Sequence, residues 1–586
     1  MAIDTILARA PASSEAQGGD VQVKSKMPSK AKCIARMKQL HNARRDYVTR
    51  WKEIRDYQLP FIGDFDDTQD STNPARRRDL KIAQGVAWLA AQAFAAGVMS
   101  GLTPPSRQWF KFAFSDNALD GDQEAARVLD ERQAIVANVL AKTNFYNSIH
   151  SCYMELPFGQ SPLGVFPASK HGVRFTQFTV GSYYLASGAD GKVNVFGRKF
   201  KMTAHQLEEQ FGRENLPEGV QRALQNNQRY EKLYTVNWLI EPNDDRMPDR
   251  IDKLNMPFRS IYWLDRSKEE EYLYVGGCEE FPVPTGRYQV SGNQPYGMGP
   301  GWFAEGDSKS YQLMKKDYLT ALELGVKPPV QAPPEAVIAG VNLIPGGLTP
   351  VESQTKIEPV FQVNIPLNYL AEEMTRVGDD IRRAYSADLF LLLDSIENGQ
   401  MTAREVMERT QEKLQQLGPV VERLQDEFLN PIIERVYNIL DRAGIFPPMP
   451  EAVAQRIAQE EIKIEYISPL AQAQKMSGLV NIEQSIAFVG QMVQLWPEVR
   501  HKVDPFGTLT EYFKIIGTPA NVSNSDERIQ QLLDAEQQAM QQQQQLEQAA
   551  VTAQAAAPAA QAAKNLTDAA LAGNPAVADW MGMGVK

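Results

Sequence analysis

The chain has 586 residues and a formal net charge of −11 at pH 7, and 43% of its residues are hydrophobic. A chain of this length can form several domains with buried cores, and its acidic balance argues against tight or sequence-specific DNA binding, which needs a basic face. Cys33, Cys152 and Cys278 are far apart and predict neither a disulfide framework nor a zinc site. No stretch reaches the roughly 18 apolar residues of a membrane span, and residues 1–20 lack an apolar signal core. We therefore expect an intracellular, soluble protein with no membrane partner.

The first predicted element is a basic helix. Residues 1–28 are small and polar and are expected to be disordered, and a helix then begins near Lys30 and ends at Pro60. Its many Lys and Arg residues allow two interpretations. A solvated basic face on a packed helix is favoured, and a basic patch that contacts nucleic acid or an acidic neighbouring subunit is the alternative.

A second helix, over about residues 79–102, is rich in alanine and glycine and is expected to pack closely against other helices. Pro104 and Pro105 end it, and Trp109–Phe112 predicts a short strand. A further amphipathic helix is predicted from about Asp122 to His150. The chain thus opens with a largely helical region.

The spacing of the apolar residues then changes from a helical period to alternation with polar residues. Between about residues 160 and 290, short β-branched and aromatic runs bounded by Gly, Asp and Asn predict antiparallel strands. Gly188–Gly191 is a candidate hairpin turn, and Met202–Phe211 predicts a small helix between strands. This stretch is predicted to be an α+β region.

Two helices are predicted on either side of a stretch rich in proline and glycine. The first is capped by Asp307 or Ser308 and runs to about Leu324, and the second runs from Asn364 to Leu393. The stretch between them has only short apolar runs, which favour a small, exposed, β-rich excursion over a core strand.

The longest predicted helix covers Met401–Gly444. Thr402 and Glu405 form a capping box, and apolar residues recur every three or four positions over roughly 60 Å. Pro419 and Pro431 are expected to bend this rod, because each removes an amide donor. The sequence beyond residue 450 predicts a helix, a short strand, two or three more helices and a Gln/Ala-rich tail that is helix-prone or disordered.

Motifs of enzymes are missing from the sequence. The five histidines are scattered without HExxH, no GxxxxGK[ST] loop is present, and near matches to a dinucleotide loop and to a nucleophile elbow fail in their glycine spacing. We therefore predict no enzyme, no metal and no cofactor. The nearest approach to a site is a group of four carboxylates on the helix predicted over Asn364–Leu393: Glu372, Glu373, Asp379 and Asp380. A solvated helix face is favoured over a metal site for this group.

Three motifs in order resemble those of a known family, the portal (head-to-tail connector) proteins of short-tailed double-stranded DNA bacteriophages. The motifs are the LTPP…WF segment Ser100–Phe110, the YG-x-x-P segment Tyr296–Pro300 with Lys327–Pro329 after a helix, and the TA-x-E segment Met401–Val406. The similarity extends over about residues 30–520. It departs at Met298 and Gly299, where Arg or Lys and Ser are expected, and in the Gln/Ala-rich tail.

The resemblance implies an α+β, mainly helical portal fold with wing, stem, clip and crown, and with the long bent helix in the wing. The implied parts are a disordered arm (1–28), the wing (29–304), two stem helices (305–326 and 364–393), the clip (327–363), a tunnel loop (394–400), the long wing helix (401–449), the crown (450–535) and a tail that is a barrel helix or disordered (536–586).

The function that the resemblance implies is a dodecameric ring at one capsid vertex, through which double-stranded DNA passes as a non-specific passenger during packaging and ejection. The implied partners are the terminase motor, a tail adaptor, and scaffolding and major capsid proteins. The implied location is the portal vertex of the virion, and the host cytoplasm during assembly.

Specific residues can be assigned to these roles by position. The tunnel loop would be Asp394, Ser395, Ile396, Glu397, Asn398, Gly399 and Gln400, with Glu397 and Asn398 at the narrowest point. The clip that meets motor and adaptor would include Ile344, Pro345, Gly346 and Gly347. Glu372, Glu373, Asp379 and Asp380 are candidates to line the channel, where like charge would keep DNA from sticking, and Arg376, Arg382 and Arg383 are expected to pair with acids of neighbouring subunits.

Two other functions remain open at this point. One is a ring-forming tail adaptor or scaffold that holds no DNA. The other is a nuclease or an ATPase whose motif is not recognisable in the sequence.

Overall fold

A computed structural model describes residues 27–65, 81–114, 123–169, 172–326 without 227, 248–249, 251, 266 and 269–270, then 330–331, 358–359, 367–387, 417–448, 462–467 and short pieces between 485 and 568. Within these ranges the chain combines helices with antiparallel sheets, so the expected α+β class is confirmed. None of the helices in the described ranges has the length and apolarity needed to cross a bilayer.

The body contains a five-stranded antiparallel sheet in the order β4-β5-β6-β7-β8. The predicted turn at Gly188–Gly191 joins its first two strands, and Gly191 adopts φ +79°, which favours glycine. The strands are β4 Tyr183–Ser187, β5 Val193–Thr203, β6 Leu233–Pro242, β7 Phe258–Leu264 and β8 Tyr274–Cys278.

A three-stranded antiparallel sheet lies beside it, in the order β3-β2-β9. Its strands are β2 Gln160–Ala168, β3 Gly172–Gln177 and β9 Thr285–Arg287. Both sheets therefore fall in the region of about 160–290 where alternating hydrophobicity predicted strands.

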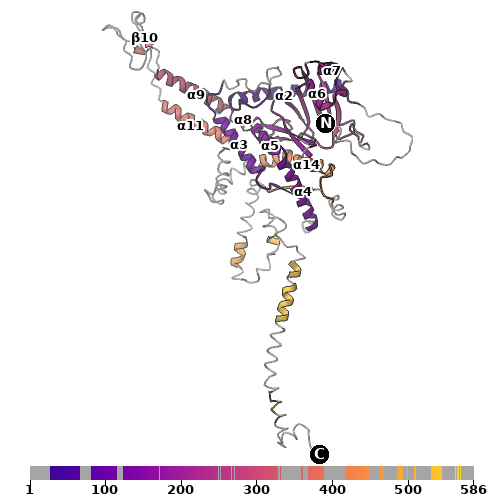
Figure 1. The fold of residues 1–586 in the computed structure, drawn as a ribbon. Coiled ribbons are helices and arrows are strands. Elements are labelled where there is room, and N and C mark those ends of the chain that lie inside the picture. Colours follow the sequence, from indigo (N-terminus) through magenta and orange to yellow (C-terminus); the bar gives the residue numbers. More distant parts are fainter. Residues whose placement is uncertain are drawn as a thin grey trace, which may run out of the picture.

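Helices cover both faces of the five-stranded sheet (Figure 1). The N-terminal half of α2 (Lys30–Tyr57) packs through Met37 and Leu40 on one face, while α6 (Ala204–Phe211) and α7 (Glu218–Gln225) cover part of the other. The main core joins α3 (Val86–Leu102), α4 (Gln123–Lys142), α5 (Phe145–Glu155) and α14 (Asn430–Arg442) to the smaller sheet. The short elements η3 Leu156–Phe158, η4 Arg213–Asn215 and α8 Pro300–Phe303 connect these parts.

The helix predicted over Asp122–His150 is in fact two helices. α4 ends at Lys142 and α5 begins at Phe145. The break lies at Asn144, whose side-chain amide donates to Phe175 O (2.8 Å) and whose Oδ1 accepts from Phe175 N (3.1 Å). Asn144 thus bonds to the edge of β3 as a strand residue would, and the chain turns there.

The helix predicted over Asn364–Leu393 is also interrupted. α11 covers Leu367–Ala384, and Ser386 then adopts φ +53°, the only positive φ of a non-glycine residue in the described ranges. A residue in the left-handed region cannot continue a right-handed helix. α11 therefore ends at Ala384, and residues 388–393 of the predicted helix lie outside the described ranges.

A two-stranded sheet is formed by strands that are far apart in sequence. β1 (Phe110–Phe114) pairs antiparallel with β12 (Ile462–Tyr466), with Phe112 opposite Ile464. Both strands were expected from the sequence, but their pairing was not. The segment after residue 450 is thereby joined to the body.

Candidate functional site

The candidate functional element is a helical hairpin that projects from the body (Figure 1). The chain runs outward along α9 (Glu305–Val326) and returns along α11, and the two helices pack against each other. Near the tip, β10 (Val330–Gln331) pairs antiparallel with β11 (Glu358–Pro359). We call residues 305–387 the α9–α11 hairpin.

Ion pairs around the buried Glu305 attach the base of the hairpin to α2. The Glu305 carboxylate is paired with Arg50 (3.0 Å) and with Lys309 (2.6 Å), and Lys309 also reaches Glu53 (3.1 Å). Burial opposes the ionisation of Glu305, but its hydrogen bonds to Glu53 and Lys309 and the nearby positive charges outweigh burial and lower its pKa. α9 begins at Glu305, not at Asp307 or Ser308 as predicted, and a charged anchor thus occupies its first turn.

Neutral hydrogen bonds attach the other side of the base. The buried Tyr385 hydroxyl donates to Gln58 Oε1 (2.6 Å), and Gln58 Nε2 donates to Gly301 O (2.8 Å). The buried Gln312 of α9 accepts from the amides of Ala83 and Gln84 before α3 (2.7 and 3.0 Å). The hairpin is therefore joined at its base to α2, α3 and α8.

The structure brings the four predicted channel carboxylates together on one side of α11. Glu372 and Glu373 are exposed, Asp379 and Asp380 are half-buried, and all four lie opposite the buried Met374, Gly378 and Ile381. Helical geometry places residues seven and eight apart on the same face, which accounts for this grouping. The carboxylates thus face away from the packed side of α11.

The arginines of α11 pair within the helix. Arg376 lies 3.6 Å from Glu373, Arg382 lies 2.5 Å from Asp379, and Arg383 lies 3.1 Å from Asp380, each three residues along. One helical turn thus supplies each arginine with a carboxylate within the chain, and pairing with acids of neighbouring subunits stays a prediction. With four carboxylates and three guanidiniums, the net charge of this face is −1.

Two sets of predicted site residues lie outside the described ranges. They are the loop Asp394–Gln400 and the group Ile344–Gly347. The start of the long helix, including Thr402 and Glu405, lies outside as well.

The long helix contains a feature that sequence reasoning missed. Residues 417–424 are α-helical, Gln425–Leu429 form a π-helical turn, and α14 follows from Asn430. Pro431 lies at the start of α14 and has no amide to donate to the preceding turn, so the bend expected at Pro431 takes the form of a π-bulge. The proline inside a helical pattern was the available signal.

The π-bulge directs Glu427 toward the smaller sheet. Arg287 of β9, which is 2% exposed, donates from Nε and Nη2 to the two Glu427 oxygens at 2.7 and 2.8 Å. The same guanidinium donates to the main-chain oxygens of Gln294 and Gly191, both at 2.8 Å. Every nitrogen of Arg287 is therefore bonded, and the pair attaches the long helix to the body.

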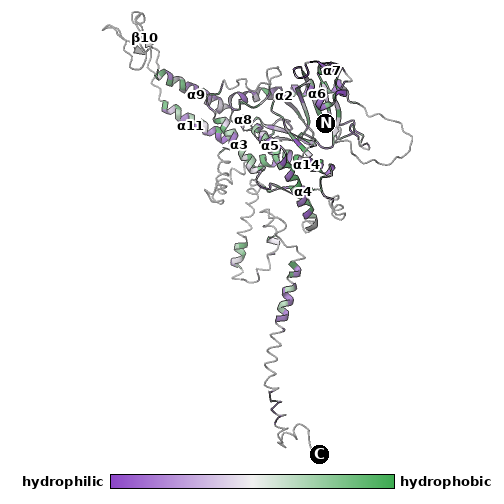
Figure 2. Cartoon of the chain, viewed as in Figure 1, coloured by the Kyte–Doolittle hydropathy of each residue, from purple (hydrophilic) through white to green (hydrophobic). Residues whose placement is uncertain are grey.

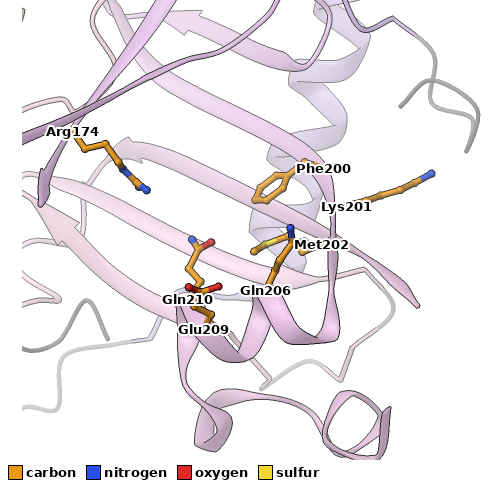
Figure 3. A pocket seen from close by; sticks show the side chains of 7 residues that line it. All are labelled: Arg174, Phe200, Lys201, Met202, Gln206, Glu209 and Gln210. Carbon is orange, nitrogen blue, oxygen red and sulfur yellow. The ribbon is translucent and has the colours of Figure 1, made fainter. Parts of the chain in front are cut away.

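A shallow cavity of about 540 Å³ lies between β3, β5 and α6 (Figure 3). Gln206, Glu209 and Gln210 of α6 line it opposite Phe200 and Met202 of β5. Its remaining lining residues are Arg174 and Lys201. The lining contains no histidine, cysteine or hydroxyl group, and its charged side chains are Arg174, Lys201 and Glu209.

Among the described residues, no three His, Cys, Asp or Glu side chains gather as metal ligands do. The thiol of Cys152 is fully buried, and burial raises its pKa well above the usual value, which keeps it protonated and unreactive.

Comparisons with known proteins agree with one another. Residues 30–523 match the family described as bacteriophage head to tail connecting protein. The portal protein of Salmonella phage epsilon15 is 32% identical over 506 residues, covering 86% of this chain and 90% of that protein. The probable portal protein of Bordetella phage BPP-1 is 33% identical over 488 residues, covering 83% and 87%.

A weaker likeness links 50% of this chain to 67% of a chain of the virion of a native gene transfer agent particle, at 10% identity and a TM-score of 0.24. The family match and the two phage relatives each cover more than four fifths of this sequence. The chain therefore belongs to the bacteriophage head-to-tail connecting, or portal, protein family.

Proposed function

We propose that this portal-family chain assembles into a dodecameric ring that forms the channel for genome packaging and ejection at one capsid vertex. In this arrangement the body is the wing, the α9–α11 hairpin is the stem, the segment between its helices is the clip, and residues 450–535 contribute the crown. The role is structural and not enzymatic. Its carrying observation is the α9–α11 hairpin, attached at its base and exposed along its length.

The anchoring of the hairpin supports a channel wall. A wall must keep its shape while DNA moves past, and the Glu305 ion pairs and the Tyr385–Gln58 bond hold the hairpin from two sides. Copies of a rigid, projecting hairpin can be placed around an axis without refolding. The family match to head-to-tail connecting proteins supports the same arrangement.

The charges of α11 support a channel through which DNA passes without being retained. Each phosphate that a cation neutralises releases counterions and adds affinity, so a conduit should offer few unpaired cations. Arg376, Arg382 and Arg383 are each engaged by a carboxylate one turn away, and the face keeps a net charge of −1. We place this exposed face toward the axis, where twelve copies would repel DNA weakly and bind it little.

We further propose that Ile344–Gly347, between the two helices in sequence, contacts the terminase motor and then the tail adaptor. Asp394–Gln400 would form the tunnel loop, with Glu397 and Asn398 at its narrowest point. Scaffolding and major capsid proteins would surround the ring in the virion, and assembly would occur in the host cytoplasm.

Negative-stain microscopy of the purified chain tests the proposal. Rings of twelve subunits with an axial hole are expected. Monomers, or rings without a hole, would instead favour a tail adaptor or scaffold that carries no DNA. ATPase and nuclease assays on the same sample should give background rates, and activity lost on changing one acidic residue would refute the structural role.

The tunnel loop has its own test. Replacing residues 395–399 with glycine and serine should leave ring assembly intact and impair DNA packaging or retention. Replacing the exposed Arg213, Glu214 and Asn215 of η4 with glycine and serine should affect neither. Normal packaging by the loop variant would remove residues 394–400 from the channel.

A further inference from the structure

The basic helix α2 presents a line of hydrogen-bond donors to solvent. Lys38, Asn42, Arg45, Thr49 and Lys52 follow each other at alternating intervals of four and three residues, which places them on one side of a helix. The first four are exposed and Lys52 is half-buried. We call these five residues the donor stripe. At 1.5 Å per residue it is about 21 Å long.

Most other cations of α2 are engaged within the chain, whereas the three cations of the donor stripe are not; Lys32, on another side of α2, is likewise exposed and without an ion pair in the described ranges. Arg36 pairs with Glu241, Arg50 with Glu305 and Arg55 with Asp56. Arg44 is buried and donates to the main-chain oxygens of Gly181 and Tyr183. Across the described ranges, no carboxylate lies within ion-pair distance of Lys38, Arg45 or Lys52, so these charges remain available to an external anion.

Packing fixes the position of the donor stripe but does not use its side chains. The opposite side of α2 is buried against β4, α8 and α9. Trp51 and Ile54 are completely buried, and Cys33, Met37 and Leu40 join the sheet core. Figure 1 shows α2 lying along the edge of the body, and in Figure 2 hydrophilic residues recur along it. The stripe is therefore a preformed surface, separate from the exposed face of α11.

We propose that the donor stripe binds the phosphate backbone of double-stranded DNA that lies outside the channel. Lys and Arg neutralise phosphates, and Asn and Thr side chains commonly donate to phosphate oxygens. Three cations spread over about 21 Å can follow a backbone whose nucleotides rise about 3.4 Å each. This contact carries no sequence information and goes beyond the conduit role.

The composition of the stripe favours DNA over an acidic protein surface. Protein interfaces are depleted in lysine and contain buried aromatic anchors, whereas DNA interfaces are polar and strongly basic. The donor stripe contains two lysines and no aromatic residue, and Ile34 near its N-terminal end is the one large, exposed apolar neighbour on its side of α2. Asp46, next to Arg45, and Glu53, next to Lys52, are the nearest carboxylates in sequence, and both lie on the adjoining side of α2.

The test measures binding of the purified, assembled protein to a fluorescent 30-base-pair duplex between roughly 50 and 200 mM KCl. The variant K38Q/R45Q/K52Q removes the three cations. The control variant K32Q/K232Q/K268Q removes three other exposed cations and has the same net charge. Both should melt within a few degrees of the parent protein, because exposed substitutions change stability little.

Weak, salt-dependent binding by the parent protein is expected. The stripe variant should bind at least tenfold more weakly at low salt, and its slope of log K against log[KCl] should fall by roughly three. The control variant should stay within about twofold of the parent protein. Equal loss in both variants, or no binding by the parent, would overturn the proposal. Displacement of the duplex by polyglutamate at equal charge, as efficiently as by unlabelled duplex, would overturn it in favour of an acidic protein partner.

Discussion

Glu155, at the end of α5, is a buried carboxyl group that links this helix to the loop between β3 and β4. Its Oε1 accepts from Gln177 Nε2 and Thr179 Oγ1, both at 2.6 Å, and its Oε2 accepts from Val180 N at 2.7 Å. Burial raises the pKa of Glu155 to about 7, although these three hydrogen bonds favour the ionised form and lower it. The side chain thus titrates near neutral pH in the folded protein.

This titration predicts a pH dependence of stability. Because the folded pKa is above the unfolded value of 4.5, the contribution of Glu155 is fully present below about pH 4.5 and is lost as pH rises toward 7. Between these limits the parent protein should lose on the order of 3 kcal/mol of unfolding free energy relative to Glu155→Gln. Denaturant titrations at several pH values measure the slope of the unfolding free energy against pH. This slope is the readout, and not the free energy at one pH, because glutamine also replaces one acceptor by a donor. The exposed Glu231→Gln should keep the parent slope, and parallel slopes for Glu155→Gln and the parent protein would contradict the pKa.

A second prediction at the scale of residues concerns Tyr385. Tyr385→Phe removes the donor to Gln58 Oε1 and leaves that buried acceptor unsatisfied. The expected loss of unfolding free energy is about 1–3 kcal/mol. Tyr369→Phe, on the same helix but 74% exposed, should change it by less than about 0.5 kcal/mol. Equal effects of the two substitutions would show that the bond does not hold the base of the hairpin.

At the scale of elements, the spacing of hydrophobic residues predicted most helices and strands but not the residues at which they end. The periodicity of α11 continues past Ala384, yet Ser386 turns the chain, and α4 and α5 are separated at Asn144. Both breaks depend on contacts with distant residues: Asn144 bonds to Phe175, and Tyr385 bonds to Gln58. Local sequence does not contain these partners. By contrast, the ion pairs of Arg376, Arg382 and Arg383 follow from spacing alone and could have been predicted.

The attachment of the long helix to the smaller sheet gives a prediction for the Arg287–Glu427 pair. Glu427→Gln leaves the buried Arg287 guanidinium without a carboxylate and should cost about 3–5 kcal/mol, whereas Arg287→Gln should cost less, because Arg423 also lies 3.6 Å from Glu427. The double variant should be more stable than the sum of the two losses implies, because neither charge is then left alone. Urea unfolding of the three variants measures this coupling. Additive losses would mean that the two side chains act independently.

At the scale of the whole molecule, the sequence and the structure agree on the α+β class and on the hairpin, and differ in how distant segments meet. β1 and β12 are about 350 residues apart, and nothing in either strand specifies the other. The Arg287–Glu427 pair was missed for the same reason. The four carboxylates of α11 were found because they share one helix, where spacing determines the face.

The charge balance of that face gives the last prediction. Glu372→Lys together with Glu373→Lys changes the net charge of the exposed face of α11 from −1 to +3 and releases Arg376 from its partner. If twelve such faces surround the axis, rings of this variant should retain duplex DNA at salt concentrations where parent rings release it, because each new phosphate contact adds affinity that falls steeply with salt. Retention can be measured by cosedimentation of rings with linear duplex over a KCl series.

The matched control is Glu231→Lys together with Asp244→Lys, which adds the same charge at exposed positions of the body. DNA threaded through an axial channel has access to α11 in every subunit, whereas these body residues lie on other elements. Stronger retention by the α11 variant than by the control, lost when the DNA ends are blocked by bulky adducts, would place α11 on the channel wall. Equal retention by both variants would mean that added charge alone binds DNA, and the face of α11 would then have to be placed away from the axis.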